Sequence, residues 1–297
     1  MNLERSPLYL TENPVGKLKN KAKLLFSEKY RTELDERLNE NLGYISETYG
    51  VHVDMGGLTR RDKKSGVAHL KTLRLDERVV ATDSLREELG KYPPEYIKSL
   101  RPSRLRVVKE LEDNVESLGG WAEDKGGRLY LSTEDGDDFF KGVIHHDLYH
   151  LADTRWIPKE YSLPIAGVIF SSPKESAFNA AWRTLNPGPG RSRYSRGAHN
   201  MATIRDAKNS HDKKQGFVSY YGASTEFEDR ATVAEKLMMN PIGLMEQAEH
   251  DKVLERKMET IKALYTRRSN GKMDENYFVD LAGGAVQEGY WTKATKN

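Results

Sequence analysis

The chain has 297 residues, of which 47 are basic and 45 acidic, so its formal net charge is +2. This balance excludes the strongly basic footprint of a nucleic-acid-binding protein, and we expect no nucleic-acid partner. The sequence contains no cysteine, which excludes disulfides and thiolate zinc sites, so a bound metal must use His, Asp or Glu. Hydrophobic residues make up 37%, enough to bury a core in one large domain or two ordinary ones.

The N-terminal region predicts neither export nor membrane insertion. Residues 1–7 lack the apolar stretch of a signal peptide. No run of about 18 apolar residues occurs, so we expect no transmembrane helix. We therefore predict a cytoplasmic protein, with export that uses no standard signal as the open alternative. Residues 1–26, with lysines at alternating positions, predict a basic N-terminal arm in solvent.

Residues 27–157 predict an α/β part. Ser27 is a capping residue for a helix that runs to about Tyr49, with leucines at helical spacing. Short apolar or alternating stretches predict strands at 51–55, 67–75, 105–108 and 128–132. A short helix ending at Gly90 and another after Pro94 lie between these strands.

Beyond residue 157 the pattern favours helices. Residues 187–197 are rich in proline, glycine and arginine and predict a loop. A helix is predicted after Thr225, and a second, amphipathic one from Val253 to Leu264. From Arg267 onward the sequence is polar. The whole of residues 27–297 therefore predicts a single domain, α/β to about residue 157 and mostly helical after it.

Three of the eight histidines lie within the stretch Ile-His-His-Asp-Leu-Tyr-His, residues 144–150. On a helix, His146 and His150 are one turn apart and project from the same face. Two imidazoles in this arrangement can chelate one ion, and neutral imidazole suits zinc. His145 points about 100° away from His146. A chance pair of this spacing is the alternative to a metal site.

A second carboxylate-rich stretch, residues 216–238, predicts a loop followed by a helix. Zinc that is held by two histidines needs a further protein ligand, and a carboxylate from another helix is one solution. Glu228 is our candidate, with Glu226, Asp229 and Glu235 as the alternative third ligands, and Asp229 could instead orient a ligand histidine. Thr225 and Glu228 also match a capping box, which gives Glu228 a purely structural explanation.

Together the two stretches resemble the zinc-binding metallopeptidases of the gluzincin type. The first reads Ile-His-His-Asp-x-x-His-Leu-Ala-Asp. The second reads Gly-Phe-Val-Ser-x-Tyr-Gly-x-Ser-Thr-x-x-Glu-Asp-x-Ala-x-Val-Ala. The resemblance implies an α+β, zincin-like fold, in which a small mixed β-sheet covers an active-site helix and the C-terminal half is mostly helical. It also implies that residues 128–132 form the edge strand beside the cleft.

The resemblance further implies a zinc-dependent hydrolase of peptide bonds that acts on a peptide or protein. His146, His150 and Glu228 would ligate Zn2+, Asp147 would be the general base, and Tyr221 would donate to the oxyanion. The family has glutamate where this chain has Asp147, and the side chain is shorter by one methylene. This departure bears on catalysis, because a general base must come within hydrogen-bond distance of the proton that it removes.

Three alternatives remain at this point. The same fold could serve as a catalytically weak or inactive module that binds a partner. A phosphohydrolase of the HD type would use the His146-Asp147 doublet with an upstream histidine, for which His69 is the nearest candidate. An iron site from His145, Asp147 and a distal histidine would normally lie on barrel strands, which the predicted helix disfavours.

Overall fold

The computed structural model describes residues 14–113, 118–123, 127–156, 179, 181–186, 194, 216–287 and 290–291, with side chains from Ser27 onward apart from that of Trp156. The helices are α1 Pro14–Tyr49, α2 Arg60–Lys64, α3 Leu75–Gly90, α4 Pro94–Leu100, α5 Asp137–Trp156, α8 Glu226–Met239, α9 Pro241–Glu249, α10 Lys252–Arg268 and α11 Glu275–Ala282. The strands are β1 Val53–Asp54, β2 His69–Lys71, β3 Arg104–Val108, β4 Glu110–Glu112, β5 Gly120–Glu123 and β6 Arg128–Ser132. Helices and a small mixed sheet thus share one chain, as predicted.

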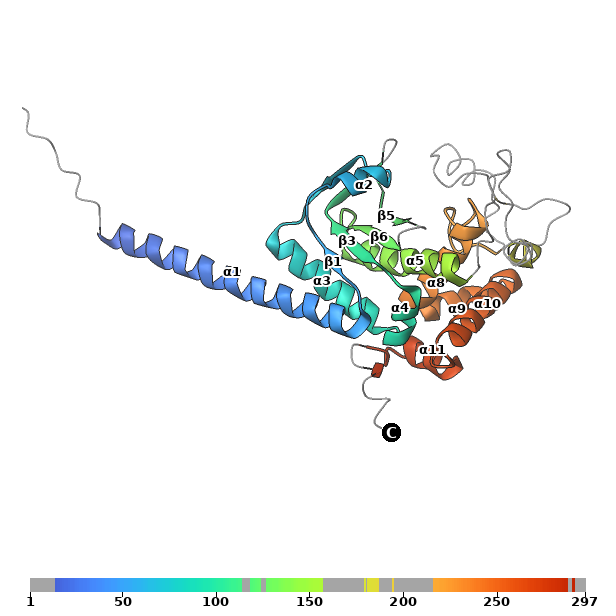
Figure 1. The fold of residues 1–297 in the computed structure, drawn as a ribbon. Coiled ribbons are helices and arrows are strands. Elements are labelled where there is room, and N and C mark those ends of the chain that lie inside the picture. The colour runs from blue at the N-terminus through green and yellow to red at the C-terminus, as the bar shows by residue number, and fades with distance from the viewer. Residues whose placement is uncertain are drawn as a thin grey trace, which may run out of the picture.

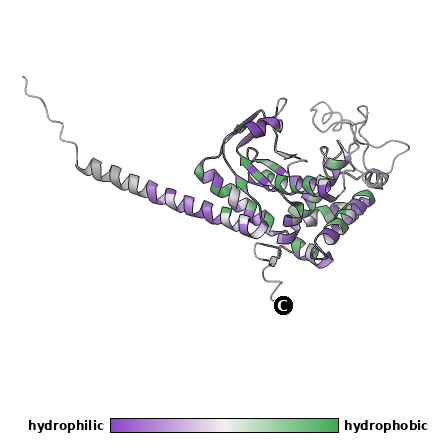
Figure 2. Cartoon of the chain, viewed as in Figure 1, coloured by the Kyte–Doolittle hydropathy of each residue, from purple (hydrophilic) through white to green (hydrophobic). Residues whose placement is uncertain are grey.

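Helix α1 projects from the rest of the molecule (Figure 1). Its backbone is helical from Pro14, so the predicted start at Ser27 is wrong, and half of the predicted basic arm belongs to the helix. Proline suits a first helical turn because the N–H that it lacks has no partner there. Residues 27–33 are exposed and largely hydrophilic (Figure 2), whereas Ile45 and Tyr49 are buried, so only the C-terminal part of α1 packs on α3.

The main sheet has the strand order β1-β3-β6-β5. Strands β1, β3 and β6 are parallel, and β5 pairs with β6 in the antiparallel direction. Strand β6 therefore lies inside the sheet, which corrects the prediction that residues 128–132 form its edge. All five of its residues are buried, as expected for a strand covered on both faces. The edge strands are β1 and β5, and β5 lies outside the predicted strands.

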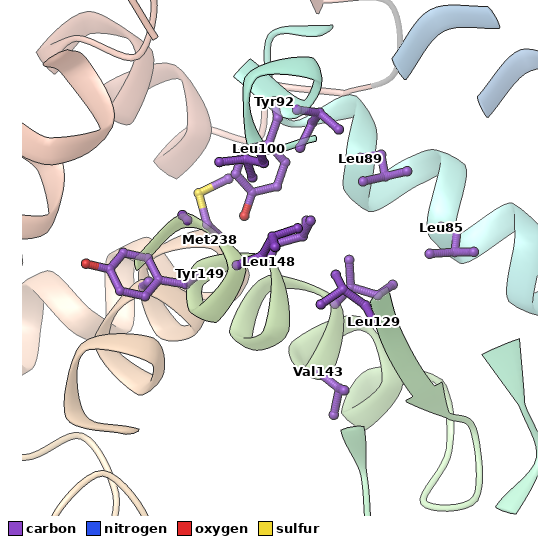
Figure 3. Close-up of a cluster of buried hydrophobic side chains, with 14 of the residues drawn as sticks. Leu85, Leu89, Tyr92, Leu100, Leu129, Val143, Leu148, Tyr149 and Met238 are labelled. Atoms are coloured by element: carbon purple, nitrogen blue, oxygen red, sulfur yellow. The ribbon is translucent and has the colours of Figure 1, made fainter. Parts of the chain in front are cut away.

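The two faces of the sheet bury different clusters, because successive side chains of a strand alternate in direction. Leu129 and Leu131 point into the main core, whereas Tyr130 joins a smaller cluster with Val67 and Leu111, under the β2–β4 ribbon. Figure 3 shows the main core, in which Leu129 of β6 lies near Val143 and Leu148 of α5. The core thus fixes α5 beneath the sheet.

The predicted strand over residues 67–75 is only partly correct. Strand β2 covers three of these residues, and α3 begins at Leu75, where the Glu77 carboxylate accepts a hydrogen bond of 2.8 Å from the Arg74 N–H. The polar C-terminal region contains a further helix, α11, and its Tyr277 and Phe278 are buried in the main core. Within the described part of the chain, no helix is both long enough and apolar enough to span a bilayer.

Helix α5 joins the two halves of the molecule. It packs against β5 and β6 of the sheet, against α3, and most extensively against α8 of the helical half. Consequently, residues on one face of α5 meet α3, those on a second face meet β5, and those on a third meet α8. Each histidine of the predicted motif must therefore be assigned to one of these faces.

Candidate metal centre

Helix α5 presents His146 and His150 to α8. Acidic residues Asp137 and Asp138 occupy its first turn, where negative charge suits the positive end of the helix dipole. The two imidazole centroids are 4.7 Å apart and the rings are nearly perpendicular. The side chains are 12% and 18% exposed, so both can be reached from solvent. Their common face follows from the i, i+4 spacing, as predicted.

Glu228 approaches the histidines from the first turn of α8. The Thr225 hydroxyl caps this helix by accepting a hydrogen bond from the Glu228 N–H. The Glu228 carboxylate, however, contacts His146 and His150, and does not serve as the second half of the predicted capping box. The backbone of Glu228 and its side chain thus have separate roles, one at the helix cap and one at the site.

The three candidate ligand atoms form a small triangle. Oε2 of Glu228 lies 2.9 Å from His146 Nε2 and 3.1 Å from His150 Nε2, and the two nitrogens are 3.1 Å apart. Bonds of about 2.0–2.2 Å in a tetrahedral zinc site place ligand atoms about 3.3–3.5 Å apart. The triangle would need to widen by roughly half an ångström to hold zinc. Within the described residues, this group has its ligand atoms close enough together for one metal ion.

Glu235, which lies seven residues after Glu228, contacts the other nitrogen of His146. The Oε2 atom of Glu235 is 3.0 Å from His146 Nδ1. A carboxylate can only accept, so Nδ1 carries the proton, and in the neutral imidazole the Nε2 lone pair faces Glu228. Glu235 therefore lies behind a candidate ligand histidine and not at the ligand position that we considered for it. The seven-residue spacing, nearly two helical turns, was a sequence signal for a shared face with Glu228.

The protonation of His146 and Glu228 reflects an excess of hydrogen-bond acceptors over donors in the site. Burial lowers the pKa of His146, but the hydrogen bonds to Glu228 and Glu235 outweigh this effect and raise it to about 10. Burial raises the pKa of Glu228, but the charges and hydrogen bonds of His150 and His146 hold it well below its ordinary value. The site thus favours a positive charge between the imidazoles and the carboxylate, which a divalent cation can supply in place of a proton.

Asp229 and Arg230, which follow Glu228, each form a buried ion pair with another helix. Asp229 Oδ2 lies 2.7 Å from Lys257 Nζ on α10, and Arg230 Nη2 lies 2.5 Å from Asp153 Oδ2 on α5. These pairs fix the first turn of α8 relative to its neighbours, and so position Glu228. Asp229 faces α10 and not the histidines, contrary to the role that we considered for it. The sequence prediction assigned no role to Lys257 or Arg230.

Asp147 lies on the face of α5 that meets β5. Its side chain is buried, and within the described structure its Oδ2 atom has no hydrogen-bond partner. Burial raises the pKa of Asp147 to about 6, although the neighbouring histidines act in the opposite direction. A carboxylate with this pKa is mostly ionised at pH 7 and is a stronger base than an ordinary aspartate.

The remaining candidates occupy distinct places. The Tyr221 ring centroid lies 5.7 Å from that of His146, so Tyr221 borders the site. Both nitrogens of His145 have other partners, which argues against an iron site that uses it. His69 is 58% exposed and lies 3.9 Å from Glu112, outside the converging group, which argues against the HD-type phosphohydrolase. Apart from Tyr194, the predicted loop at residues 187–197 lies outside the described residues.

No family model matches this sequence, and no curated protein matches it. Among solved structures, the chain is similar to one described as a "putative zinc-binding metallo-peptidase" from Bacteroides caccae. That likeness has a TM-score of 0.46 at 14% sequence identity, and it covers 87% of this chain and 93% of the other. At this level of similarity, the chemistry of the chain has to be argued from its own residues.

Proposed function

We propose that this protein is a zinc-dependent metallopeptidase that hydrolyses peptide bonds in a peptide or protein substrate. The observation that supports this most directly is the convergence of His146, His150 and Glu228 on one point. Zinc bound there would lower the pKa of a coordinated water to about 7 and polarise the scissile carbonyl. In this proposal the fold is zincin-like, with α5 as the active-site helix and α8 as the helix that supplies the carboxylate ligand.

Two residues would act on the reacting groups. Asp147, which follows the first ligand histidine directly, would be the general base, and its raised pKa suits proton transfer near neutral pH. Tyr221, whose ring lies beside His146, would donate a hydrogen bond to the carbonyl oxygen as negative charge develops on it. Glu235 would keep His146 in the tautomer that ligates zinc, through the 3.0 Å contact with its Nδ1 atom.

The deciding experiment combines metal analysis with a hydrolysis assay on the full chain. Plasma mass spectrometry should find about one zinc per chain, and an unfolded protein substrate should be cleaved only by the zinc-loaded form. Glu228→Ala should lose both zinc and cleavage, whereas exposed Glu249→Gln, on α9, should retain both. A wild-type chain that binds no zinc when zinc is supplied would contradict the proposal.

A second candidate is a protein with the same metal site that binds a partner without hydrolysis. The observation that favours it is the short, buried Asp147 side chain at the position of the general base. Such a protein would bind one zinc per chain and cleave nothing, and Asp147→Glu could then create cleavage. Zinc-dependent cleavage by the wild type that is lost in Asp147→Asn would decide for the peptidase.

A further inference from the structure

Strand β5 passes Asp147 at a distance that only glycine permits. A Cβ atom at Gly120 would lie 2.1 Å from Asp147 Oδ2 and 3.0 Å from its Cγ. Real Cβ atoms essentially never approach another atom to 2.1 Å, so any side chain here would displace the carboxylate or the strand. Gly120 is not among the residues with positive φ, so its backbone would accept other residues. The requirement for glycine therefore comes from the neighbouring carboxylate.

The Asp147 carboxylate differs from the other buried aspartate of α5. Asp153 accepts two hydrogen bonds from Arg230 through its Oδ2 atom. Asp147 Oδ2 is buried and has no hydrogen-bond partner among the described residues, although leaving a buried acceptor unpaired is costly. It points instead into the space that a Gly120 side chain would fill. The orientation of this oxygen is therefore controlled by shape and not by a hydrogen-bond donor.

We propose that Gly120 is a positioning residue for Asp147. The space left by the missing side chain receives the Asp147 carboxylate, and the close approach of β5 limits where this short side chain can lie. The inference rests on the proposed function, because positioning has a catalytic consequence only if Asp147 is the general base. A displacement of about 1 Å at a reacting group can cost about 100-fold in rate.

The kinetic test compares Gly120→Ala with Gly119→Ala. A Cβ at Gly119 would lie 2.6 Å from the ring of Phe139, which is the end of a side chain that is 46% exposed. Gly119→Ala should therefore keep the wild-type kcat. Gly120→Ala should keep one zinc per chain and a KM within about twofold, while kcat falls at least about tenfold and its dependence on pH shifts. An unchanged kcat and pH profile in Gly120→Ala would overturn the proposal.

A second measurement needs neither zinc nor activity. The Cβ of Gly120→Ala would also lie 2.6 Å from Val143 Cγ1, so part of any destabilisation could come from that contact. Double-mutant cycles by urea unfolding of the zinc-free chain separate the two. The destabilisation should shrink in an Asp147→Ala background. If the destabilisation shrank in a Val143→Ala background but not in an Asp147→Ala background, Gly120 would serve packing only. That result would contradict the inference, whether or not the chain is a peptidase.

Discussion

His145 and His146 are neighbours on α5, but they face two different regions of the molecule. His145 points toward the C-terminal end of α3, where its Nε2 lies 2.6 Å from Glu88 Oε2. Its Nδ1 lies 2.8 Å from the hydroxyl of Tyr92, which follows this helix. One partner can donate and the other accepts, which satisfies a neutral imidazole. Burial lowers the pKa of His145, even though Glu88 acts in the opposite direction. This region therefore holds a neutral, fully paired histidine.

His146 points toward α8, where its partners are mostly acceptors. Carboxylates face both of its nitrogens, and the His150 imidazole lies beside Nε2 as well. No neutral tautomer can satisfy two carboxylates at once, so a proton or a metal ion must supply the missing positive charge. The comparison teaches that the balance of donors and acceptors around a histidine distinguishes a structural residue from a candidate metal ligand.

The largest expected effect comes from removing His146, which faces the candidate metal site. His146→Ala should weaken zinc binding by more than about 100-fold, beyond the effect that is typical of an outer partner. His145→Ala should retain zinc at one per chain and lose about 2 kcal/mol of stability, because the buried Tyr92 and Glu88 lose a partner. Competition with a chelator gives the affinity, and urea unfolding the stability. Zinc loss in both variants would erase the distinction between the two regions.

The next effect concerns the ion pair that holds α8 to α5. Arg230→Met leaves Asp153 buried and without its charged partner, so it should lower the free energy of unfolding by about 3–5 kcal/mol. The double variant Asp153→Leu with Arg230→Met should recover much of this loss. Breaking the exposed pair Lys252–Glu255 by Lys252→Met should change stability by less than 1 kcal/mol. Urea unfolding compares all three, and equal losses would contradict the role assigned to burial.

Asp147→Asn should stabilise the zinc-free protein while abolishing hydrolysis. The folded pKa of about 6 exceeds the unfolded value of 3.8, so the folded state binds more protons between these pH values. Wild-type stability therefore falls as pH rises from about 4 to 6, by about 2–3 kcal/mol, and asparagine removes this loss. The variant should be more stable than the wild type at pH 7, with the difference shrinking toward pH 4. A constant difference across this range would show that Asp147 does not titrate as described.

The smallest effect sharpens the role of Glu235. Glu235→Gln keeps a hydrogen-bond acceptor near His146 Nδ1 but removes the charge, so zinc affinity should fall by about 10–100-fold without loss of the site. The zinc affinity of Glu235→Leu, which removes the acceptor as well, should fall further. Isothermal titration with zinc measures both variants against the wild type. If Glu235→Leu bound zinc as tightly as the wild type, the contact would have no part in holding His146.

Short-range patterns predicted some elements well and others poorly. The amphipathic spacing from Val253 predicted α10, and the apolar run at residues 128–132 predicted β6 with its observed bounds. Strand β5 was missed because it begins at Gly120, the second of two consecutive glycines, and such a pair favours a turn. It is a strand because it pairs with β6, which its local sequence does not reveal. Helix α11 was missed because the sequence around Tyr277 and Phe278 is polar, although these two residues were an evident apolar anchor. The structure buries both of them in the main core.

By itself, the sequence determined that His146 and His150 share a face, because the helical repeat fixes the spacing of residues four apart. It could not decide which acidic residue of α8 joins them. Asp229 lies about 100° around the helix from Glu228, whereas Glu235 lies nearly in line with Glu228, two turns further on. Only the tertiary structure decides how α8 is rotated about its axis and how far along it the histidines lie. The Asp229–Lys257 and Arg230–Asp153 ion pairs hold α8 so that Glu228 faces the histidines.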